Sequence, residues 1–391
     1  MLLMVMLLAI LLTALGWYVA RDIFAPCVAG PGIWFVAIFV FYVLPNNFFN
    51  VENNFPFALT IWLVGFFFSS LITENFTPAS SSDSISREPN KIVLRIYTIL
   101  TIISLPILSC LIIWQAVVED PENIFRYMRI MNTGIDEDIE KPDVGILMYS
   151  TSLGFVMLFF SFMYLKNKWL IGLIVFLNIL FAATTVSKTA FLNTMFASLL
   201  VCYYKGKVKI KHIVIGLVAF VALSFCIQLL RASEDDFETN SFLALYLSSS
   251  IVAFDYYVMP GASAVFGANT FRLFYAIGHS LGLCKEPVQT ILPYVCVPEL
   301  TNTYTNLYPF YEDFGMVGIM VFSVVYGIIY GFLYKKSKTG GNMELIVFSI
   351  FATFLMMEFI GEFIFTNLSL TLQYIIFAAI PFMIPSRKET K

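Results

Sequence analysis

The sequence contains few charged residues and almost no histidine. Charged side chains make up 13% of the 391 residues, and there are two histidines. Soluble domains carry about 25% charged residues, so this chain cannot cover a water-exposed surface of its size. Basic residues are scattered between apolar runs and form no stripe, which argues against nucleic-acid binding. Neither Cys-x-x-Cys nor His-x-x-x-His spacing occurs, so the sequence predicts no metal site and no cofactor.

Apolar residues are abundant and grouped into long runs. They make up 59% of the chain, and a helix needs about 20 of them to cross the hydrocarbon core of a membrane. We therefore predict an all-α fold, a polytopic transmembrane helical bundle of about 11–12 spans forming a single integral membrane domain over residues 1–391. Eleven runs are identified: Leu2–Ala20, Cys27–Leu44, Phe57–Ile72, Ile92–Val118, Val144–Leu165, Trp169–Val186, Ala190–Tyr204, Ile213–Leu230, Phe314–Tyr334, Glu344–Ile360 and Ile364–Ile384.

The first run and the basic loops predict the orientation of the chain. Leu2–Ala20 lacks a basic leader and a small-residue cleavage site, so we expect it to be retained as a helix. Most of the 23 basic residues fall on one side of the predicted spans, including those of Lys205–Lys211 and Lys335–Lys338. Cytoplasmic loops are enriched in Lys and Arg. The C-terminus is then inside, and eleven spans place the N-terminus outside.

Two segments are expected on the outer side. Glu119–Asp143 is acidic and is typical of a solvated loop. Residues 231–313 form a large periplasmic loop, and long loops are usually functional. Within it, the apolar stretch Phe242–Met259 is expected to lie at the interface or to re-enter the membrane. Cys284 and Cys296 lie in the same loop and either stay free or, in an oxidising compartment, form a disulfide.

Three cations lie at predicted span ends or in the outer loop. Lys188 lies between two spans, Arg231 ends a span, and Arg272 lies within the long loop. Cations that converge on one cavity suit a diphosphate, because guanidinium groups bind phosphate oxygens in pairs. The alternative for each is a side chain that reaches the membrane interface without a binding role.

A second polar group precedes the ninth predicted span. Asp313 is expected either to cap that helix or to act as a base or orienting group for a hydroxyl. Tyrosines nearby would stack on a sugar, although tyrosine also favours membrane interfaces. The candidates of this group are Tyr304, Thr305, Tyr308, Glu312 and Asp313.

The order of these motifs resembles the Wzy-type oligosaccharide repeat-unit polymerases, the O-antigen polymerases of bacterial envelopes. The resemblance covers roughly residues 180–340 and departs from the family at Lys188, where arginine is common. The motifs that carry it are Ser187-Lys188-Thr189-Ala190, Arg231, Ser250 to Tyr257, Gly267 to Arg272, Tyr304-Thr305 and Asp313-Phe314-Gly315-Met316-Val317-Gly318.

The resemblance implies a GT-C-like fold and a glycosyltransferase of the bacterial inner membrane, with its active site facing the periplasm. It implies transfer of a growing oligosaccharide from undecaprenyl diphosphate to a new lipid-linked repeat unit, without nucleotide sugar or metal. Implied partners are these lipid-linked oligosaccharides, membrane lipids, a flippase and a chain-length co-polymerase. Arg231 and Arg272 would bind the diphosphate with help from Lys188, and Asp313 or Tyr304, or less directly His279, would act on the acceptor. Thr305 and Glu312 would contact substrate.

Other membrane functions remain open at this point. A transporter or flippase should show an internal repeat and broken helices, and no repeat is evident in the sequence. A lipid-donor O-antigen ligase should carry a histidine near the last outer loop, and an acyltransferase should carry one near its first helices. Neither region has a histidine.

Overall fold

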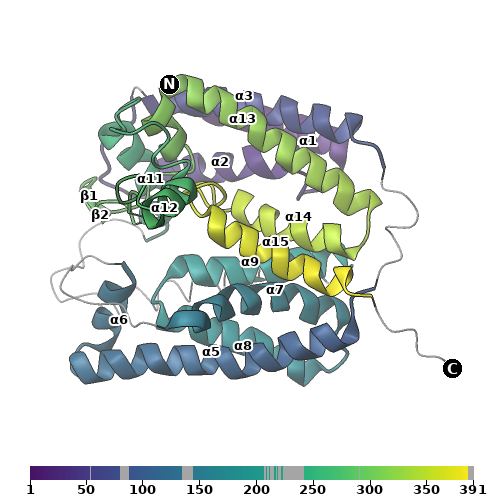
Figure 1. Ribbon diagram of the computed structural model, residues 1–391. Helices are drawn as coiled ribbons and strands as arrows, with labels where there is room; N and C mark the ends of the chain where they lie inside the picture. Colours follow the sequence, from purple (N-terminus) through teal and green to yellow (C-terminus); the bar gives the residue numbers. More distant parts are fainter. Residues whose placement is uncertain are drawn as a thin grey trace. The chain divides into compact units, whose positions relative to one another are not determined.

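The computed structural model describes residues 1–52, 54–79, 88–133, 144–206, 242–289 and 291–385, with isolated positions 208, 211, 215–216, 218 and 222. The described residues form thirteen α-helices, one 3-10 turn and a hairpin of two short strands, so the predicted all-α class is confirmed (Figure 1). Six helices are long and apolar enough to cross a membrane, which indicates a multi-pass membrane protein. The other apolar helices are shorter, and the total of eleven spans stays a prediction.

Most apolar runs become helices near their predicted ends. The first run coincides with α1 (Leu2–Ala20) at both ends, whereas Ile213–Leu230 lies largely outside the described residues. The largest differences lie in α13 and α14. Helix α13 extends beyond the predicted run Phe314–Tyr334 at both ends, from Tyr308 to Thr339, with a break at Gly315 close to the predicted start. Helix α14 ends at Leu355 instead of Ile360. As a result Glu312 and Asp313 lie in a helical segment, and Glu358 lies after the end of α14.

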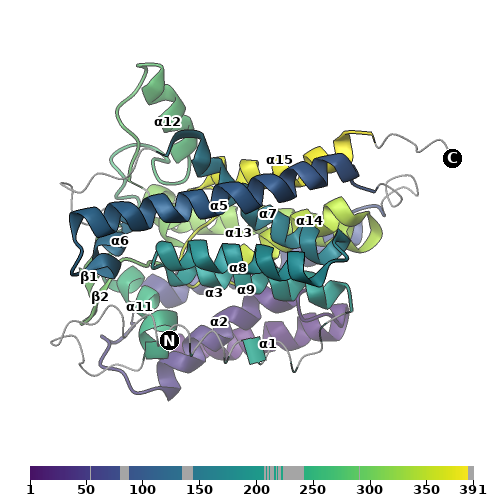
Figure 2. The same ribbon diagram turned by 90° about the horizontal axis from the view of Figure 1, so that it is seen from below.

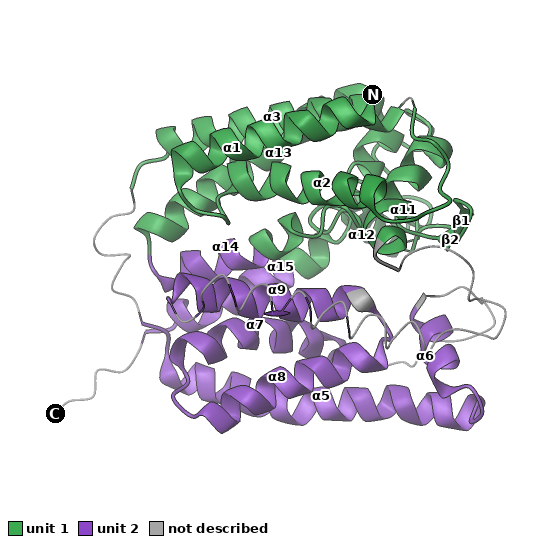
Figure 3. Cartoon of the chain, turned by 180° about the vertical axis from the view of Figure 1, so that it is seen from behind, with its two compact units in different colours: residues 1–81, 239–340, 351–371 green, residues 82–238, 341–350, 372–391 purple. Residues whose placement is uncertain are grey.

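The chain folds into two compact units (Figure 3). Unit 1 contains residues 1–81, 239–340 and 351–371, and unit 2 contains residues 82–238, 341–350 and 372–391. Helices α14 (Asn342–Leu355) and α15 (Leu368–Met383) contribute residues to both units. This division describes packing within the chain, and the single membrane domain stays a prediction.

Unit 1 is built around two long helices that run side by side, α3 (Asn54–Phe76) and α13 (Tyr308–Thr339) (Figure 1). Their close approach depends on Gly331, where an added Cβ would lie 2.4 Å from the carbonyl oxygen of Ser70. Small residues at such contacts let helices pack tightly in a membrane, where dispersion contacts drive association. Helices α1 and α2 (Pro26–Val43) form a hairpin beside this pair.

One end of unit 1 joins the ends of three helices. Asp22 follows α1 and forms an ion pair with Lys338 near the end of α13. Lys336 donates a hydrogen bond to the carbonyl of Pro78, which follows α3. The predicted cytoplasmic positions Arg21 and Lys335–Lys338 therefore do lie at the same end of this unit.

The opposite end of unit 1 holds the start of α3 against α11 (Phe242–Tyr257). The Asp255 carboxylate accepts hydrogen bonds from the backbone N–H groups of Asn54 and Phe55 at 2.9 and 2.8 Å, which satisfies donors at a helix start. Ser248 in the middle of α11 donates to the carbonyl of Ala37 in α2. Helix α11 is thus buried among the helices of its unit, and its expected place, at the membrane interface or in a re-entrant segment, stays a prediction.

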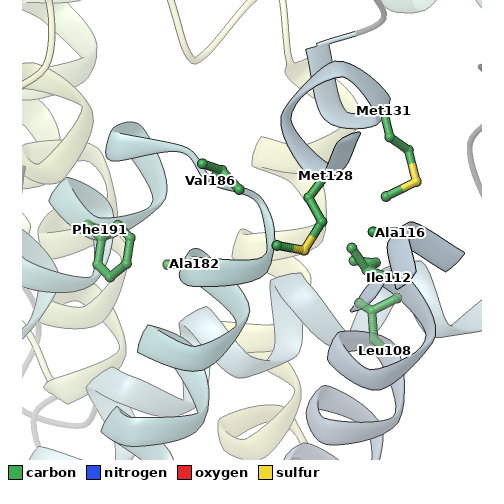
Figure 4. Packing of buried hydrophobic residues seen from close by; sticks show 8 residues of the cluster. All are labelled: Leu108, Ile112, Ala116, Met128, Met131, Ala182, Val186 and Phe191. Atoms are coloured by element: carbon green, nitrogen blue, oxygen red, sulfur yellow. The ribbon is translucent and has the colours of Figure 1, made fainter. Parts of the chain in front are cut away.

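Unit 2 is a group of helices that share an apolar cluster (Figure 4). The predicted solvated loop after residue 119 is wrong in part, because residues 124–133 form an amphipathic helix whose Met128 and Met131 are buried in this cluster. Residues 134–143 of that loop lie outside the described residues. The elements of unit 2 are α5 (Lys91–Glu119), α6 (Ile124–Thr133), the 3-10 turn Gly145–Met148, α7 (Tyr149–Tyr164), α8 (Lys168–Thr184) and α9 (Lys188–Tyr204).

Candidate functional site

The carboxylate of Asp313 is held by a turn from a distant part of the chain. Its Oδ2 accepts a 2.8 Å hydrogen bond from the backbone N–H of Thr270, and its Oδ1 accepts bonds from the backbone and side-chain nitrogens of Asn269 at 3.3 and 2.9 Å. This turn leads directly into α12 (Arg272–Ser280). Asp313 therefore fixes the backbone just before Arg272. The expected cap on its own helix is not formed, because the carboxylate accepts its hydrogen bonds from Asn269 and Thr270 instead.

A break in α13 creates the second feature of the site. Gly315 has φ 63° and ψ −149°, which interrupts the helix at a conformation that favours glycine. The carbonyls of Tyr311 and Glu312 accept hydrogen bonds from the N–H groups of Gly261 and Ser263 at 3.1 and 3.2 Å. The break thus gives the outer loop backbone acceptors that an uninterrupted helix keeps for itself.

Tyr304 is a buried hydrogen-bond donor. Its side chain is 3% exposed, and its hydroxyl donates to the carbonyl of Pro293 at 2.9 Å. Burial, with a smaller contribution from the Glu312 charge, raises the pKa of Tyr304 to about 12. The hydroxyl therefore stays protonated at neutral pH and is unsuited to act as a base. Its ring lies 5.2 Å from the ring of Tyr308, centroid to centroid.

Thr305 follows in an unusual backbone conformation. Its φ is 66°, which is rare for a β-branched residue. Its hydroxyl oxygen accepts a bond from the N–H of Leu307, and its backbone forms a parallel bridge with Gly361. With 1% exposure it is buried, so its role is to shape the start of α13.

Glu312 keeps an oxygen that no described residue engages. Its side chain lies close to that of Tyr308, and its Oε2 is buried with no hydrogen-bond partner among the described residues. Asp313, by contrast, has both oxygens engaged. Of the two adjacent carboxylates, Glu312 has the freer acceptor for a proton or a hydroxyl.

The guanidinium group of Arg272 is only partly hydrogen-bonded within the described part of the protein. Its Nε donates to the carbonyl of Val288 at 2.6 Å, and its two terminal nitrogens have no partner among the described residues. The helix that it begins stands clear of α1 and α2 (Figure 2). A cavity of about 340 Å³, within the size range of small-ligand pockets, adjoins the same helix. It is lined by Phe266, Phe271, Phe274, Tyr275 and Cys284.

The other predicted cations are not placed with Arg272. Lys188 is the first residue of α9 in unit 2, after the expected turn between α8 and α9. Arg231 lies outside the described residues. The convergence of three cations therefore stays a prediction. Nowhere in the described part of the chain do three His, Cys, Asp or Glu side chains come together as metal ligands.

The outer-loop thiols and histidine have separate surroundings. Cys284 and Cys296 are both free, so the disulfide considered for them is not formed. The Cys284 thiol donates to the carbonyl of Tyr275 at 3.2 Å instead. His279 lies in the last turn of α12, and its Nδ1 is 3.3 Å from the carbonyl oxygen of Cys284.

Sequence analysis missed two buried carboxylates of unit 1. Glu358 and Glu362 are 3% and 7% exposed. They lie in the stretch between α14 and α15, in or beside runs that were predicted as spans. The signal that identifies them is a carboxylate at the end of an apolar run, since an ionisable residue at membrane depth usually has a function.

Comparison of the chain with protein-family models, curated proteins and solved structures found no match.

Proposed function

We propose that this chain is an O-antigen or polysaccharide polymerase of the bacterial inner membrane. It transfers a growing oligosaccharide from undecaprenyl diphosphate to a new lipid-linked repeat unit on the periplasmic side. The observation that carries the proposal is the link between Asp313 and the Asn269–Thr270 turn, which joins two of the motifs that resemble the polymerase family. In the sequence, the resemblance rests only on the order of these motifs, whereas in the structure two of them are in contact.

The surroundings of Arg272 suit an amphiphilic lipid diphosphate. The unengaged terminal nitrogens of a guanidinium bind phosphate oxygens in pairs and stabilise the charge of a leaving diphosphate. Phe271 and Phe274 of the same segment line an apolar cavity that accepts part of an isoprenoid chain. One short helix thus offers both a charged and an apolar contact, as a lipid-linked donor requires.

The acceptor side of the reaction is assigned to Glu312. Its unengaged carboxylate oxygen accepts the proton of the attacking sugar hydroxyl. Asp313 is a positioning residue that holds the Arg272 segment, and Tyr304 is a protonated donor that holds the segment at Pro293. The sequence had suggested Asp313 or Tyr304 as the base, and this proposal gives that role to Glu312 instead.

The location of this group supports an active site on the outer side. Asp313 and Arg272 lie at the end of unit 1 opposite Lys338 and the other basic residues. Basic residues mark the cytoplasmic side of membrane proteins. This arrangement supports the proposal that the candidate site faces the periplasm, where lipid-linked repeat units are polymerised.

Deletion of the gene in its host tests the proposal by lipopolysaccharide gel electrophoresis. We expect the ladder to collapse to core plus one repeat unit. Core alone would contradict polymerase activity and indicate a ligase or a flippase. An unchanged ladder would exclude all three functions for this pathway.

A complementation series separates site residues from folding. Arg272→Ala should fail to restore the ladder, and Arg272→Lys should restore only short chains, because lysine lacks the planar fork. Lys285→Ala, a change of the same charge in the same loop, serves as the control and should restore it fully. Membrane abundance of each variant is measured by immunoblotting. Full restoration by Arg272→Ala would refute the diphosphate role.

A lipid or polysaccharide flippase is the second candidate. The interruption between α14 and α15, with Glu358 and Glu362 in it, favours this class, because broken helices often form transporter sites. Loss of a flippase leaves core without any repeat unit, so the same gel distinguishes the two functions.

A further inference from the structure

Glu358 and Glu362 are two buried carboxylates without a basic partner. Both lie in unit 1, in the stretch that connects α14 to α15, and neither forms a salt bridge within the described residues. A buried ionised carboxylate is costly unless hydrogen bonds or an opposite charge compensate for lost hydration. The two glutamates meet this requirement in different ways.

Glu362 is stabilised by the protein alone. Its Oε1 accepts hydrogen bonds from the backbone N–H groups of Ile364 and Phe365 at 2.6 and 2.9 Å, and its Oε2 accepts one from Thr366 at 2.6 Å. The Tyr326 hydroxyl also donates to Oε1. Both oxygens of Glu362 therefore have partners within the protein, and the side chain holds the turn before α15.

Only one of the two carboxylate oxygens of Glu358 has hydrogen-bond partners in the described part of the chain. Its Oε2 accepts hydrogen bonds from the indole N–H groups of Trp34 and Trp62 at 3.0 and 3.3 Å. Its Oε1 is buried and has no partner among the described residues. Indole nitrogens can only donate, so they orient the carboxylate without taking its charge.

Asn306 lies next to Glu358 in the fold, and its side chain is itself unsatisfied. It is 1% exposed, and both atoms of its side-chain amide lack a hydrogen-bond partner among the described residues. Its backbone N–H donates to the carbonyl of Glu358 at 2.8 Å, which fixes the two residues next to each other. A buried amide left without partners costs about 1–3 kcal/mol per group. Such a group indicates an occupant that supplies the missing contacts.

A small cavity lies where these groups meet. Its volume of about 10 Å³ is close to the minimum for a single water-sized occupant. The preceding helix α14 directs its C-terminal end, with its partial negative charge, toward this stretch of chain. The cavity is lined by Asn306, Tyr326, Tyr330, Phe354, Glu358, Gly361, Glu362, Phe363 and Ile364.

We propose that Glu358 and Asn306 form a binding site for one monovalent cation of the size of Na⁺ at the break between α14 and α15. The Glu358 Oε1, the Asn306 amide oxygen and the tyrosine hydroxyl oxygens are hard ligands of the kind such cations take. A calcium ion takes six to eight oxygen ligands, more than these groups supply. The inference concerns a site separate from Arg272 and does not depend on the polymerase activity.

Thermal unfolding of the full-length protein in detergent tests the site. Sodium chloride replaces choline chloride at constant ionic strength, and we expect the unfolding temperature to rise with the logarithm of Na⁺ concentration above the dissociation constant. Glu358→Gln, which keeps the shape and removes the charge, should lose this shift. Glu344→Gln, at the other end of α14, should keep it.

A second measurement needs no glutamate variant. Trp34 and Trp62 are 0% and 1% exposed and contact the Glu358 carboxylate, so Na⁺ should change their fluorescence. The change should be smaller in Trp62→Phe and unaltered in Trp114→Phe, whose side chain is 69% exposed in the native protein. A protein with equal unfolding temperature and fluorescence in Na⁺ and choline would overturn the proposal and indicate a protonated Glu358 beside a water molecule. A sodium shift that persists in Glu358→Gln would overturn it as well.

Discussion

The Asp22 carboxylate and the Lys338 ammonium lie 2.6 Å apart and join the end of α1 to the end of α13. Asp22 is 5% exposed and also accepts hydrogen bonds from the Phe24 N–H and the Tyr334 hydroxyl. The buried carboxylate therefore joins its own turn to α13, whereas the Lys338 side chain is 42% exposed.

This asymmetry predicts unequal effects of removing the two partners. Lys338→Met should reduce the free energy of unfolding by less than about 1 kcal/mol, because the ammonium is well exposed. Asp22→Ala should cost about 2–3 kcal/mol, since it leaves buried donors unpaired. Thermal unfolding in detergent measures both, with Lys335→Met as the charge-matched control. Equal losses for Asp22→Ala and Lys338→Met would contradict this interpretation.

Removing the positioning carboxylate should weaken donor binding more than it slows chemistry. We expect Asp313→Ala to release the Asn269–Thr270 turn and raise the KM for the lipid-linked donor about tenfold, which corresponds to about 1.4 kcal/mol. Polymerisation of purified lipid-linked repeat units measures the kinetic constants. A loss in kcat with unchanged KM would instead assign Asp313 to the chemical step.

The two acceptor-side candidates should respond differently to conservative changes. Glu312→Gln should abolish polymerisation, because an amide cannot accept the hydroxyl proton. Tyr304→Phe should keep most of the activity and lose about 1 kcal/mol of stability with the bond to Pro293. The same assay, combined with thermal unfolding, separates these outcomes. An active Glu312→Gln protein would refute the base assignment.

The raised pKa of Tyr304 has a defined effect on stability. A tyrosine with a folded-state pKa of about 12 and an ordinary value near 10 when unfolded binds its proton more tightly in the folded protein. Its contribution is fully present below pH 10 and is lost as the pH rises toward 12. Tyr304→Phe should therefore make the unfolding temperature less sensitive to pH above 10, while the profiles between pH 6 and 9 stay parallel. Profiles that diverge in the neutral range would contradict this.

Close packing between α3 and α13 should depend on the absence of a side chain at Gly331. Gly331→Ala places a methyl group 2.4 Å from the Ser70 carbonyl oxygen, so one helix must shift. We expect a loss of about 1–3 kcal/mol, as for other overpacked contacts. Gly172→Ala in α8 is the matched control, because an added Cβ there meets nothing within 4 Å. Comparable stability of the two variants would show that the close contact is unimportant.

Hydropathy predicted the helices well but not the polar contacts at their ends. It placed α1 correctly because lipid-length apolar runs have one stable form. It missed the start of α13, since Tyr308 to Asp313 are polar enough to read as loop although they continue the helix up to Gly315. The partners of Asp313, Asn269 and Thr270, lie 44 and 43 residues earlier, and such pairs follow from tertiary packing. The predicted span Glu344–Ile360 included Glu358, although the charge of this residue is evident from the sequence.

The contact between Asp255 and the start of α3 has a consequence for biosynthesis. Phe55 and Asp255 are 200 residues apart in the chain. At about 5–20 residues per second, α3 waits roughly 10–40 s after its own synthesis before the residue that caps it is made. Its inward face, including Trp62, must meanwhile be accommodated by lipid or by the insertion machinery. Mutations that slow translation between these two positions lengthen the period in which the nascent chain is open to degradation.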